Sequence, residues 1–304
     1  MGDGAFTAIT TVSVGGGSPF AIAAADMNAD QKIDLVTAHN NSNNVKLIKA
    51  TAARTYAVPT TAETFAAGAG PYAIALGDID GKNGPDIVVA NNGSSNVSLL
   101  LNSGGNAFAT QVTSGTDAQP TAVLLGSFAN TKLDFATANK NGNSATVRLN
   151  NGTNGFSSTA TTISTGAKNP TAIVAGDWNA DGKMDLAMAN SGDMLAVIAL
   201  GQGNGSFTAG TNPTVSTALG DHTIATADFN LDGKPDLAIA NEKTGDVSIL
   251  LGNGDGTFGA MTSFPVGTTP GSISIADLNK DSFPDLITTD RGANSVVIRL
   301  GQCS

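Results

Sequence analysis

The chain of 304 residues has few of the features that mark membrane, nucleic-acid-binding or disulfide-stabilised proteins. It contains no run of eighteen apolar residues, so we expect no membrane insertion. Lys and Arg form no basic patch, which argues against a nucleic-acid partner. The single cysteine, Cys303, excludes an intramolecular disulfide. No segment long enough for a helix has an apolar period of 3.6 residues, so we expect an all-β protein.

Sequence motifs of common enzyme families are also absent. There is no Gly-x-Ser-x-Gly, no His/Cys pair and no phosphate-binding loop. The two histidines, His39 and His222, fall at the ends of predicted strands, where polar loop residues are common. We therefore expect a binding module rather than an enzyme, and leave open an active site assembled across several repeats.

The chain does contain a repeat of about fifty residues. An acidic segment recurs with starts at 26, 78, 127, 177, 228 and 277, so the steps are 52, 49, 50, 51 and 49 residues. A fixed period of this length indicates a repeat architecture. Sixteen of the 25 acids lie in these six segments, so the net charge of −10 belongs mostly to the repeated loops.

Each acidic segment has the spacing of a cation-binding loop. The copy at 228–237 reads Asp-Phe-Asn-Leu-Asp-Gly-Lys-Pro-Asp-Leu, with side-chain oxygens at positions 1, 3, 5 and 9. Oxygen-only ligands on a flexible loop suit calcium, and the carbonyl at position 7 adds another oxygen. Glycine at position 6 permits a left-handed turn. The alternative is an Asn/Asp-rich turn without a metal, since these residues favour turns in their own right.

Four of the loops are complete, and we expect calcium at each. The loop at 78–86 has Lys82 at position 5 in place of an acid, which puts its ion in doubt, and the loop at 127–134 keeps only Asp134 and is expected to be empty. The predicted ligands of the four complete loops are Asp26, Asn28, Asp30, Lys32 and Asp34; Asp177, Asn179, Asp181, Lys183 and Asp185; Asp228, Asn230, Asp232, Lys234 and Asp236; and Asp277, Asn279, Asp281, Phe283 and Asp285.

Four short apolar runs make up each repeat. In the fifth repeat they are 224–227, 237–240, 247–251 and 258–266, and we term them strands A, B, C and D, with the acidic loop joining A to B. Four antiparallel strands per fifty residues form one propeller blade. The sequence therefore predicts a single domain, 1–304, that is a six-bladed β-propeller.

The two ends of the chain complement each other. The last repeat stops after strand C, and Gly2-Asp3-Gly4-Ala5-Phe6 matches Gly254-Asp255-Gly256-Thr257-Phe258. We expect Phe6–Val14 to supply the missing strand D beside 295–300 and so close the ring, since an open array would expose two unpaired edges. Because the chain begins inside a repeat without a secretion signal, we interpret it as a segment or mature form.

The repeats resemble the FG-GAP/VCBS family, which includes the β-propeller of integrin α-subunits. The resemblance rests on the Asp-x-Asn-x-Asp-Gly-x-x-Asp-Leu loops, the Ala-Asn after strand B, the turn at 250–258 and Gly-x-x-Pro before strand A. It covers essentially the whole chain and implies the propeller fold and calcium. Integrin propellers have seven blades, whereas six repeats are present here. The family includes adhesion modules, lectins and accessory domains of polysaccharide-degrading enzymes.

These observations lead to a functional hypothesis. We expect a monomeric, calcium-stabilised, extracellular or cell-surface module for adhesion or carbohydrate binding, because weak calcium loops fill only where calcium is near millimolar. Its protein or glycan ligand should bind on the face opposite the calcium loops. The alternatives are a catalytic or non-catalytic propeller domain of a polysaccharide lyase or hydrolase, and a structural spacer. The candidate ligand-binding residues are Phe20, Tyr72, His222, His39 and Arg291.

Overall fold

The protein is described by a computed structural model. The structure describes residues 11–52, 55–105, 107–152, 155–164, 166–193, 195–216 and 222–302. The chain divides into two compact units, one of residues Ala8–Thr162 and one of Met1–Thr7 with Ile163–Ser304, and each is described by itself. No helix of the described residues is long and apolar enough to cross a membrane.

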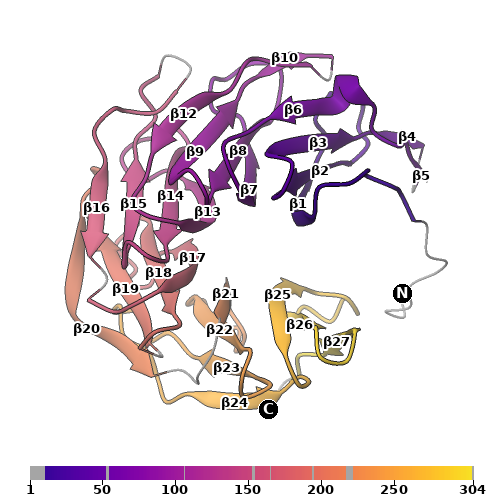
Figure 1. Cartoon of the computed structure of the whole chain (residues 1–304). Helices are drawn as coiled ribbons and strands as arrows, with labels where there is room; N and C mark the ends of the chain where they lie inside the picture. Colours follow the sequence, from indigo (N-terminus) through magenta and orange to yellow (C-terminus); the bar gives the residue numbers. More distant parts are fainter. Residues whose placement is uncertain are drawn as a thin grey trace. The chain divides into compact units, whose positions relative to one another are not determined.

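The fold is that of an all-β, six-bladed β-propeller, as expected, and each blade is one antiparallel sheet (Figure 1). The first blade contains β1 (Pro19–Ala25), β2 (Asp34–His39), β3 (Asn44–Ile48) and β6 (Thr64–Ala66). The second contains β7 (Pro71–Gly77), β8 (Asp86–Asn91), β9 (Asn96–Leu100) and β12 (Val112–Gly115). The third contains β13 (Pro120–Gly126), β14 (Asp134–Asn139), β15 (Ser144–Arg148) and β16 (Thr161–Ser164).

The remaining blades repeat this order. The fourth contains β17 (Pro170–Gly176), β18 (Asp185–Asn190), β19 (Leu195–Gly201) and β20 (Phe207–Ser216). The fifth contains β21 (His222–Ala227), β22 (Asp236–Asn241), β23 (Asp246–Leu250) and β24 (Thr262–Pro265). The sixth has three strands among the described residues: β25 (Pro270–Ala276), β26 (Asp285–Asp290) and β27 (Ser295–Arg299).

The turn between strands C and D carries its own small pairing. It is a two-stranded sheet in the first blade, β4 (Ala50–Ala52) with β5 (Thr55–Tyr56), and in the second, β10 (Asn102–Gly104) with β11 (Ala107–Phe108). The third and fifth blades have single bridges, from Asn150 to Phe156 and from Gly252 to Phe258. Strand D of the fifth blade is therefore only Thr262–Pro265, and the prediction of one strand over 258–266 was too long. The first blade also has a short 3₁₀ helix, η1 (Thr61–Glu63).

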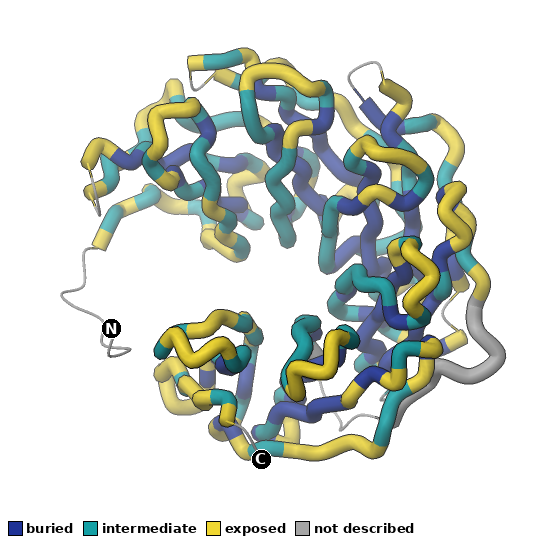
Figure 2. The backbone as a smooth tube through the Cα atoms, turned by 180° about the vertical axis from the view of Figure 1, so that it is seen from behind, coloured by how far each residue is buried: buried dark blue, intermediate teal, exposed yellow. Residues whose placement is uncertain are grey.

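The core lies between neighbouring blades of a unit. In β8, β14, β18 and β22 all six residues are buried, because both faces of strand B are covered (Figure 2). One cluster joins Met27 and Val36 of the first blade to Ile87 of the second. Another joins Trp178 of the fourth blade to Leu237 and Ile239 of the fifth. Burial on both faces explains why strand B reads as a continuous apolar run rather than an alternation.

The predicted ring closure stays a prediction. Residues 1–10, which include most of the proposed strand, lie outside the described residues, and residues 11–14 form no strand. The prediction that all six repeats form one domain is likewise untested.

Candidate functional site

The acidic loops join strands A and B of each blade, and the four complete loops have two left-handed residues each. At position 6, Gln31, Gly182, Gly233 and Ser282 have φ of 65°, 79°, 84° and 76°. The left-handed turn predicted there is thus present even where the residue is not glycine. At position 4, Ala29, Ala180, Leu231 and Lys280 have φ of 60°, 56°, 58° and 63°. Only the turn at position 6 was expected from the sequence.

The oxygens of positions 1 and 5 are aimed into the loop. In the first loop Asp26 accepts from the backbone N–H of Asp30 at 3.1 Å and of Gln31 at 2.7 Å. Asp30 in turn accepts from the N–H of Lys32 at 2.9 Å. The same bonds recur in the other three complete loops. The loop backbone therefore holds the carboxylates on its concave side, as a cation site requires.

Lysine at position 7 lies beside the carboxylate at position 5. The ammonium Nζ of Lys32 is 3.0 Å from Asp30, that of Lys183 is 3.0 Å from Asp181, and that of Lys234 is 3.7 Å from Asp232. The hydrogen bond from the Lys32 side chain lowers the pKa of Asp30, and that from Lys183 lowers the pKa of Asp181. The backbone N–H of Lys234 is the main cause of the lowered pKa of Asp232. These carboxylates are therefore ionised at neutral pH.

The aspartate at position 9 has a structural task in all six repeats. Asp134 accepts from the N–H of Phe128 at 2.9 Å and from the N–H of Asn150 at 2.7 Å. Equivalent pairs of bonds are made by Asp34, Asp86, Asp185, Asp236 and Asp285, each to one N–H six or seven residues earlier and one sixteen residues later. All six side chains are fully buried. We call this arrangement the aspartate brace.

The brace explains the degenerate third loop. Asp134 is the one acid that this loop keeps, and it is the acid that ties the start of strand B to the end of strand C. Sequence reasoning assigned position 9 only to the metal, and that assignment stays a prediction. The third loop keeps Asp134 although it lacks the other acids of the motif, and this was the sequence signal that position 9 has a second role.

Three carboxylates converge in the second loop. Asp78, Asp80 and Asp86 offer oxygens within 4.8 Å of one another, the one such group among the residues that the structure describes. Lys82 Nζ is 3.6 Å from Asp80. Burial raises the pKa of Asp86 to about 6, and the neighbouring Asp80 and Asp78 add to the rise. An excess of negative charge at this loop is thus relieved by a proton or a cation.

Neighbouring blades are linked at the same edge. The buried side chain of Asn102 donates to the carbonyl of Met27 in the preceding loop at 2.8 Å, and Asn150 donates to Ile79 at 2.8 Å. In the other unit the N–H of Gly256 donates to Trp178 at 2.8 Å. Each of these carbonyls belongs to position 2 of an acidic loop. A change in loop conformation would therefore be transmitted to the next blade.

The opposite edge carries the predicted ligand residues on β-bulges. The pairing of strands A and B shifts register just after the first proline of β1, β7, β13, β17 and β25. Phe20 and Tyr72 are the extra residues of the first two bulges, and their ring centroids lie 4.1 Å apart. Phe20 is 54% exposed. A bulge re-aims a side chain, and here it presents an aromatic pair about 20 Å along strand A from the acidic loop.

Of the other three candidate ligand residues, His39 alone differs from expectation. His39 is fully buried, with Nε2 2.9 Å from the Thr37 hydroxyl, and burial lowers its pKa, so it does not reach a ligand. His222 pairs with Asn241, the last residue of strand B, as the first proline does in the other A strands; β21 has no bulge after it. The side chain of His222 is not among those that the structure describes. Arg291 is exposed and pairs with Glu242 at 2.5 Å.

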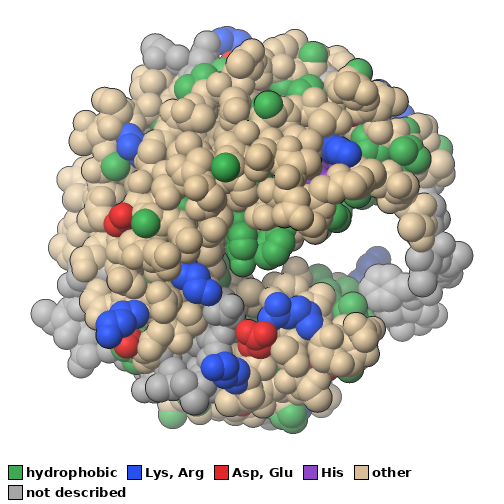
Figure 3. Space-filling view, in the orientation of Figure 1, with side chains coloured by type: hydrophobic (Ala, Val, Ile, Leu, Met, Phe, Trp, Pro, Cys, Tyr) green, Lys and Arg blue, Asp and Glu red, His purple; other side chains and the backbone are tan. Residues whose placement is uncertain are grey.

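The remaining strand-B termini are not surface residues. Asn91, Asn139, Asn190 and Asn241 are fully buried and donate to neighbouring side chains or carbonyls. These amides therefore bond to polar groups within the blade rather than to a ligand at its surface. In the view of Figure 3 only isolated acidic side chains are visible, and basic ones lie near them.

A family comparison agrees with these features. The model of the FG-GAP-like repeat matches residues 129–188, 177–239 and 228–288. The chain belongs to the FG-GAP-like repeat family. The second and third matched segments of the FG-GAP-like repeat each span two successive acidic loops, so the unit that the family model describes includes a brace and the strands on either side. No curated protein matches the chain at the level of sequence.

Solved structures share the fold of this FG-GAP-like repeat protein at low identity. A functionally unknown protein from Desulfotomaculum acetoxidans has TM-score 0.64 and 13% identity, with 87% of this chain and 78% of that one covered. Virginiamycin B lyase from Staphylococcus aureus, inactivated and bound to quinupristin, has TM-score 0.60 and 14% identity over 94% and 85%. BBS1N, solved with ARL6DN, has TM-score 0.60 and 11% identity over 91% and 77%. Such identities indicate the fold alone.

Proposed function

We propose that this FG-GAP-like repeat protein is a calcium-stabilised extracellular recognition module that binds a protein or glycan ligand. The observation that carries the calcium part is the donor set of the four complete loops: two carboxylates and an amide oxygen, on one short loop wound by two left-handed residues. An oxygen-only set of this kind suits calcium. The predicted residues fit the ion, and the carbonyls of Lys32, Lys183, Lys234 and Phe283 would add a ligand each.

Electrostatics supports the need for a cation. Each complete loop places three carboxylates within ten residues, and the one at position 9 is buried. Burial raises the pKa of Asp34, Asp185 and Asp236, so a nearby divalent cation would favour their charged forms. Residence outside the cell follows, because loops of modest affinity fill only where calcium is near millimolar.

The ligand part rests on Phe20 and Tyr72. This aromatic pair, in which Phe20 is exposed and Tyr72 half-buried, offers an apolar surface on a rigid strand end beside polar turns, which suits a sugar ring or an apolar side chain. The turns near it are fixed by cross-blade bonds, since Asn40 donates to the Pro71 carbonyl at 3.3 Å. A ligand would therefore meet a preformed surface.

Calcium titration by calorimetry tests the first part. We expect about four sites, and Asp228→Ala combined with Asp232→Ala should remove one of them. Chelation should lower Tm, since a site filled at a hundredfold excess stabilises the fold by about 2.7 kcal/mol. No heat of binding and a melting curve indifferent to chelator would refute the calcium proposal.

A glycan array and a protein-binding screen, each with and without chelator, test the second part. Once a ligand is found, Phe20→Ala and Tyr72→Ala should abolish binding, and Asn253→Ala, at the calcium edge of the fifth blade, should not. Unchanged binding by the aromatic variants would place the ligand elsewhere. Polysaccharide cleavage would favour an enzyme instead.

A further inference from the structure

A structural rule holds at the turn after strand C in five blades. The second residue after that strand, or in the fourth blade its last residue, donates its N–H to the aspartate brace and pairs with an aromatic residue six residues later. The five pairs are Ala50 with Tyr56, Asn102 with Phe108, Asn150 with Phe156, Gly201 with Phe207, and Gly252 with Phe258. The first member of each pair is buried.

The sixth blade has the first member of this pair and lacks the second among the described residues. Gly301 donates to Asp285 at 2.8 Å, as its five counterparts do to their own aspartates. It is nevertheless only half-buried. In other blades the residue before the first member of the pair also accepts a hydrogen bond at its carbonyl. Leu251 accepts from the N–H of Gly259 at 2.8 Å, and Leu149 accepts from that of Ser157 at 2.7 Å. Leu300 stands at this position in the sixth blade.

The aromatic rings of the other blades occupy a common place. Phe108 packs with the cluster that contains Met27, and Phe156 with the cluster that contains Ile79. Phe258 lies 6.5 Å from Trp178. Met27, Ile79 and Trp178 are all at position 2 of the preceding acidic loop. Each ring therefore fills the gap between its own blade and the blade before it.

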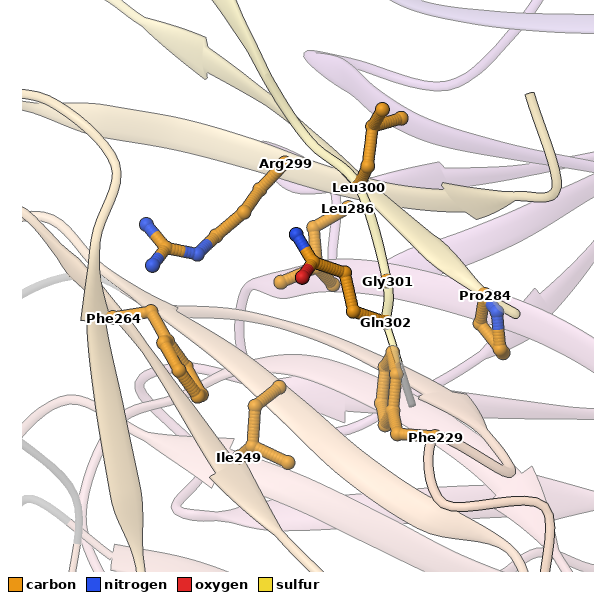
Figure 4. Close-up of a pocket in the computed structure, with 9 residues that line it drawn as sticks. All are labelled: Phe229, Ile249, Phe264, Pro284, Leu286, Arg299, Leu300, Gly301 and Gln302. Carbon is orange, nitrogen blue, oxygen red and sulfur yellow. The ribbon is translucent and has the colours of Figure 1, made fainter. Parts of the chain in front are cut away.

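An empty apolar pocket of about 430 Å³ lies at this place beside the sixth blade (Figure 4). It is lined by Phe229, which is position 2 of the preceding loop, and by Leu286, the counterpart of the Phe135 that contacts Phe156 at 4.7 Å. Phe264 lines it as well and corresponds to Phe65, which contacts Phe108 at 4.9 Å. Every neighbour that an aromatic ring has in the other blades is thus present around the pocket.

We infer that the side chain of Phe6 is the occupant of this pocket. In sequence, Gly2-Asp3-Gly4-Ala5-Phe6 matches the segment that ends at Phe258, so Phe6 is the missing sixth aromatic. By analogy with Phe258 and Gly259, we expect its backbone to pair with Gly301 and the N–H of Thr7 to donate to the Leu300 carbonyl. The inference names one aromatic side chain and its seat, and it holds whether or not residues 8–14 continue as a strand.

Arg299 closes one side of this seat. Its guanidinium carbon lies 4.9 Å from the centroid of the Phe264 ring, and its Nη1 donates to the Pro265 carbonyl at 3.3 Å. Arg148 occupies the same position in the third blade, where it donates to Gly115 in the preceding blade at 2.7 Å. It also donates to Ser157 at 2.7 Å and Ser158 at 2.6 Å, the two residues that follow the aromatic Phe156. Thr7 is the counterpart of Ser157, so its carbonyl is the matching acceptor for Arg299.

Disulfide trapping in the full chain tests the inference directly. In the turns with a seated aromatic, Gln202 donates to Ser206 at 3.0 Å and Asn253 to Thr257 at 3.0 Å, so Gln302 should lie opposite Ala5. In a Cys303→Ser background, Ala5→Cys with Gln302→Cys should form an intramolecular disulfide on mild oxidation, because directly paired residues have the Cα separation that this bond needs. The matched control is Ala5→Cys with Gln202→Cys, the same position in the fourth blade, which should stay reduced.

Each outcome decides the matter. A disulfide between 5 and 302 within one chain supports the inference. A disulfide between two chains would show that the pocket takes the segment of a second copy, and no disulfide or equal trapping by Gln202→Cys would overturn it. As a second measurement, Phe6→Ala should lower Tm by about 5–10 °C, and Phe6→Leu should restore most of that loss. Equal Tm values for Phe6→Ala and the unsubstituted chain would contradict a buried ring.

Discussion

Removing the carboxylate of Asp134 isolates the aspartate brace from calcium. The third loop has no other acid, so a change at Asp134 affects the backbone bonds that it accepts, from Phe128 at 2.9 Å, from Asn150 at 2.7 Å and from the N–H of Ala129. The side chain is fully buried, so water cannot replace it. Asp134→Ala leaves two buried N–H donors without a partner, each costing about 1–3 kcal/mol. We therefore expect a loss of about 3–5 kcal/mol in unfolding free energy.

Asp134→Asn tests whether the Asp134 side chain stabilises the blade through its acceptor oxygens or only by filling space. The amide keeps one acceptor oxygen and places an NH₂ group against the second N–H, so about half of the loss should remain. Asn130→Ala is the matched control: Asn130 is an exposed residue of the same loop that accepts one bond, from Lys132 at 2.8 Å. Its effect should stay below about 1 kcal/mol.

Urea unfolding followed by circular dichroism measures these differences, as shifts in midpoint at constant slope. The loss in Asp134→Ala should be the same in calcium and in chelator, whereas that in Asp236→Ala should be larger in calcium. A change below 1 kcal/mol for Asp134→Ala, or an equal loss for Asn130→Ala, would refute the brace.

Three further predictions follow from the loops and the chain ends. The folded pKa of Asp86 is about 6, above its unfolded value of about 3.9; its protonation thus favours the folded state below about pH 4, and this gain is lost as pH rises through about 6. In chelator the urea midpoint should rise as pH falls from 7 to 5, saturating calcium should reduce the rise, and a midpoint that falls in chelator would contradict this. Gly233→Ala should cost about 1–2 kcal/mol, since φ is 84° and no atom lies within 4 Å of the added Cβ, whereas Gly16→Ala, also with open space, should be neutral in the same melts. Removal of residues 1–15 should expose the edge of β27 and cause aggregation in size-exclusion chromatography; a truncated chain that stays monomeric and melts normally would argue against closure by this segment.

The repeat made the blades and their loops predictable, because identical spacing places identical groups at each A–B turn. The roles of single residues were harder to predict. Asp34 and Asp26 are both aspartates of one motif, and the sequence does not show that Asp34 is the fully buried one, which accepts from Ala50 sixteen residues later. The amide of Asn91 suggested the surface, yet it is buried beside Ser98. A polar side chain needs a hydrogen-bond partner, but its residue type does not tell whether that partner is solvent or a group inside the blade.

Register was the second limit. The proline that begins five A strands is followed by a bulge, whereas His222 begins β21 without one and pairs with Asn241 at the position of those prolines. Strand D was overextended for a similar reason. Phe258 pairs with Gly252 while its ring lies near Trp178, and the chain rejoins the sheet only at Thr262. Apolar character alone cannot separate a residue that extends a strand from one that fills a gap between blades.

The aspartate brace also bears on how such chains gain and lose length. Its acceptor and both donors lie within 23 residues of one another, inside a single copy of the motif. A duplication or deletion of one whole period of about fifty residues would leave every brace intact, wherever its breakpoints fell outside that interval. A shorter insertion or deletion within it would strand a buried carboxylate or a buried N–H. Short length changes should therefore concentrate between the end of one brace and the start of the next, and longer ones should add or remove whole periods.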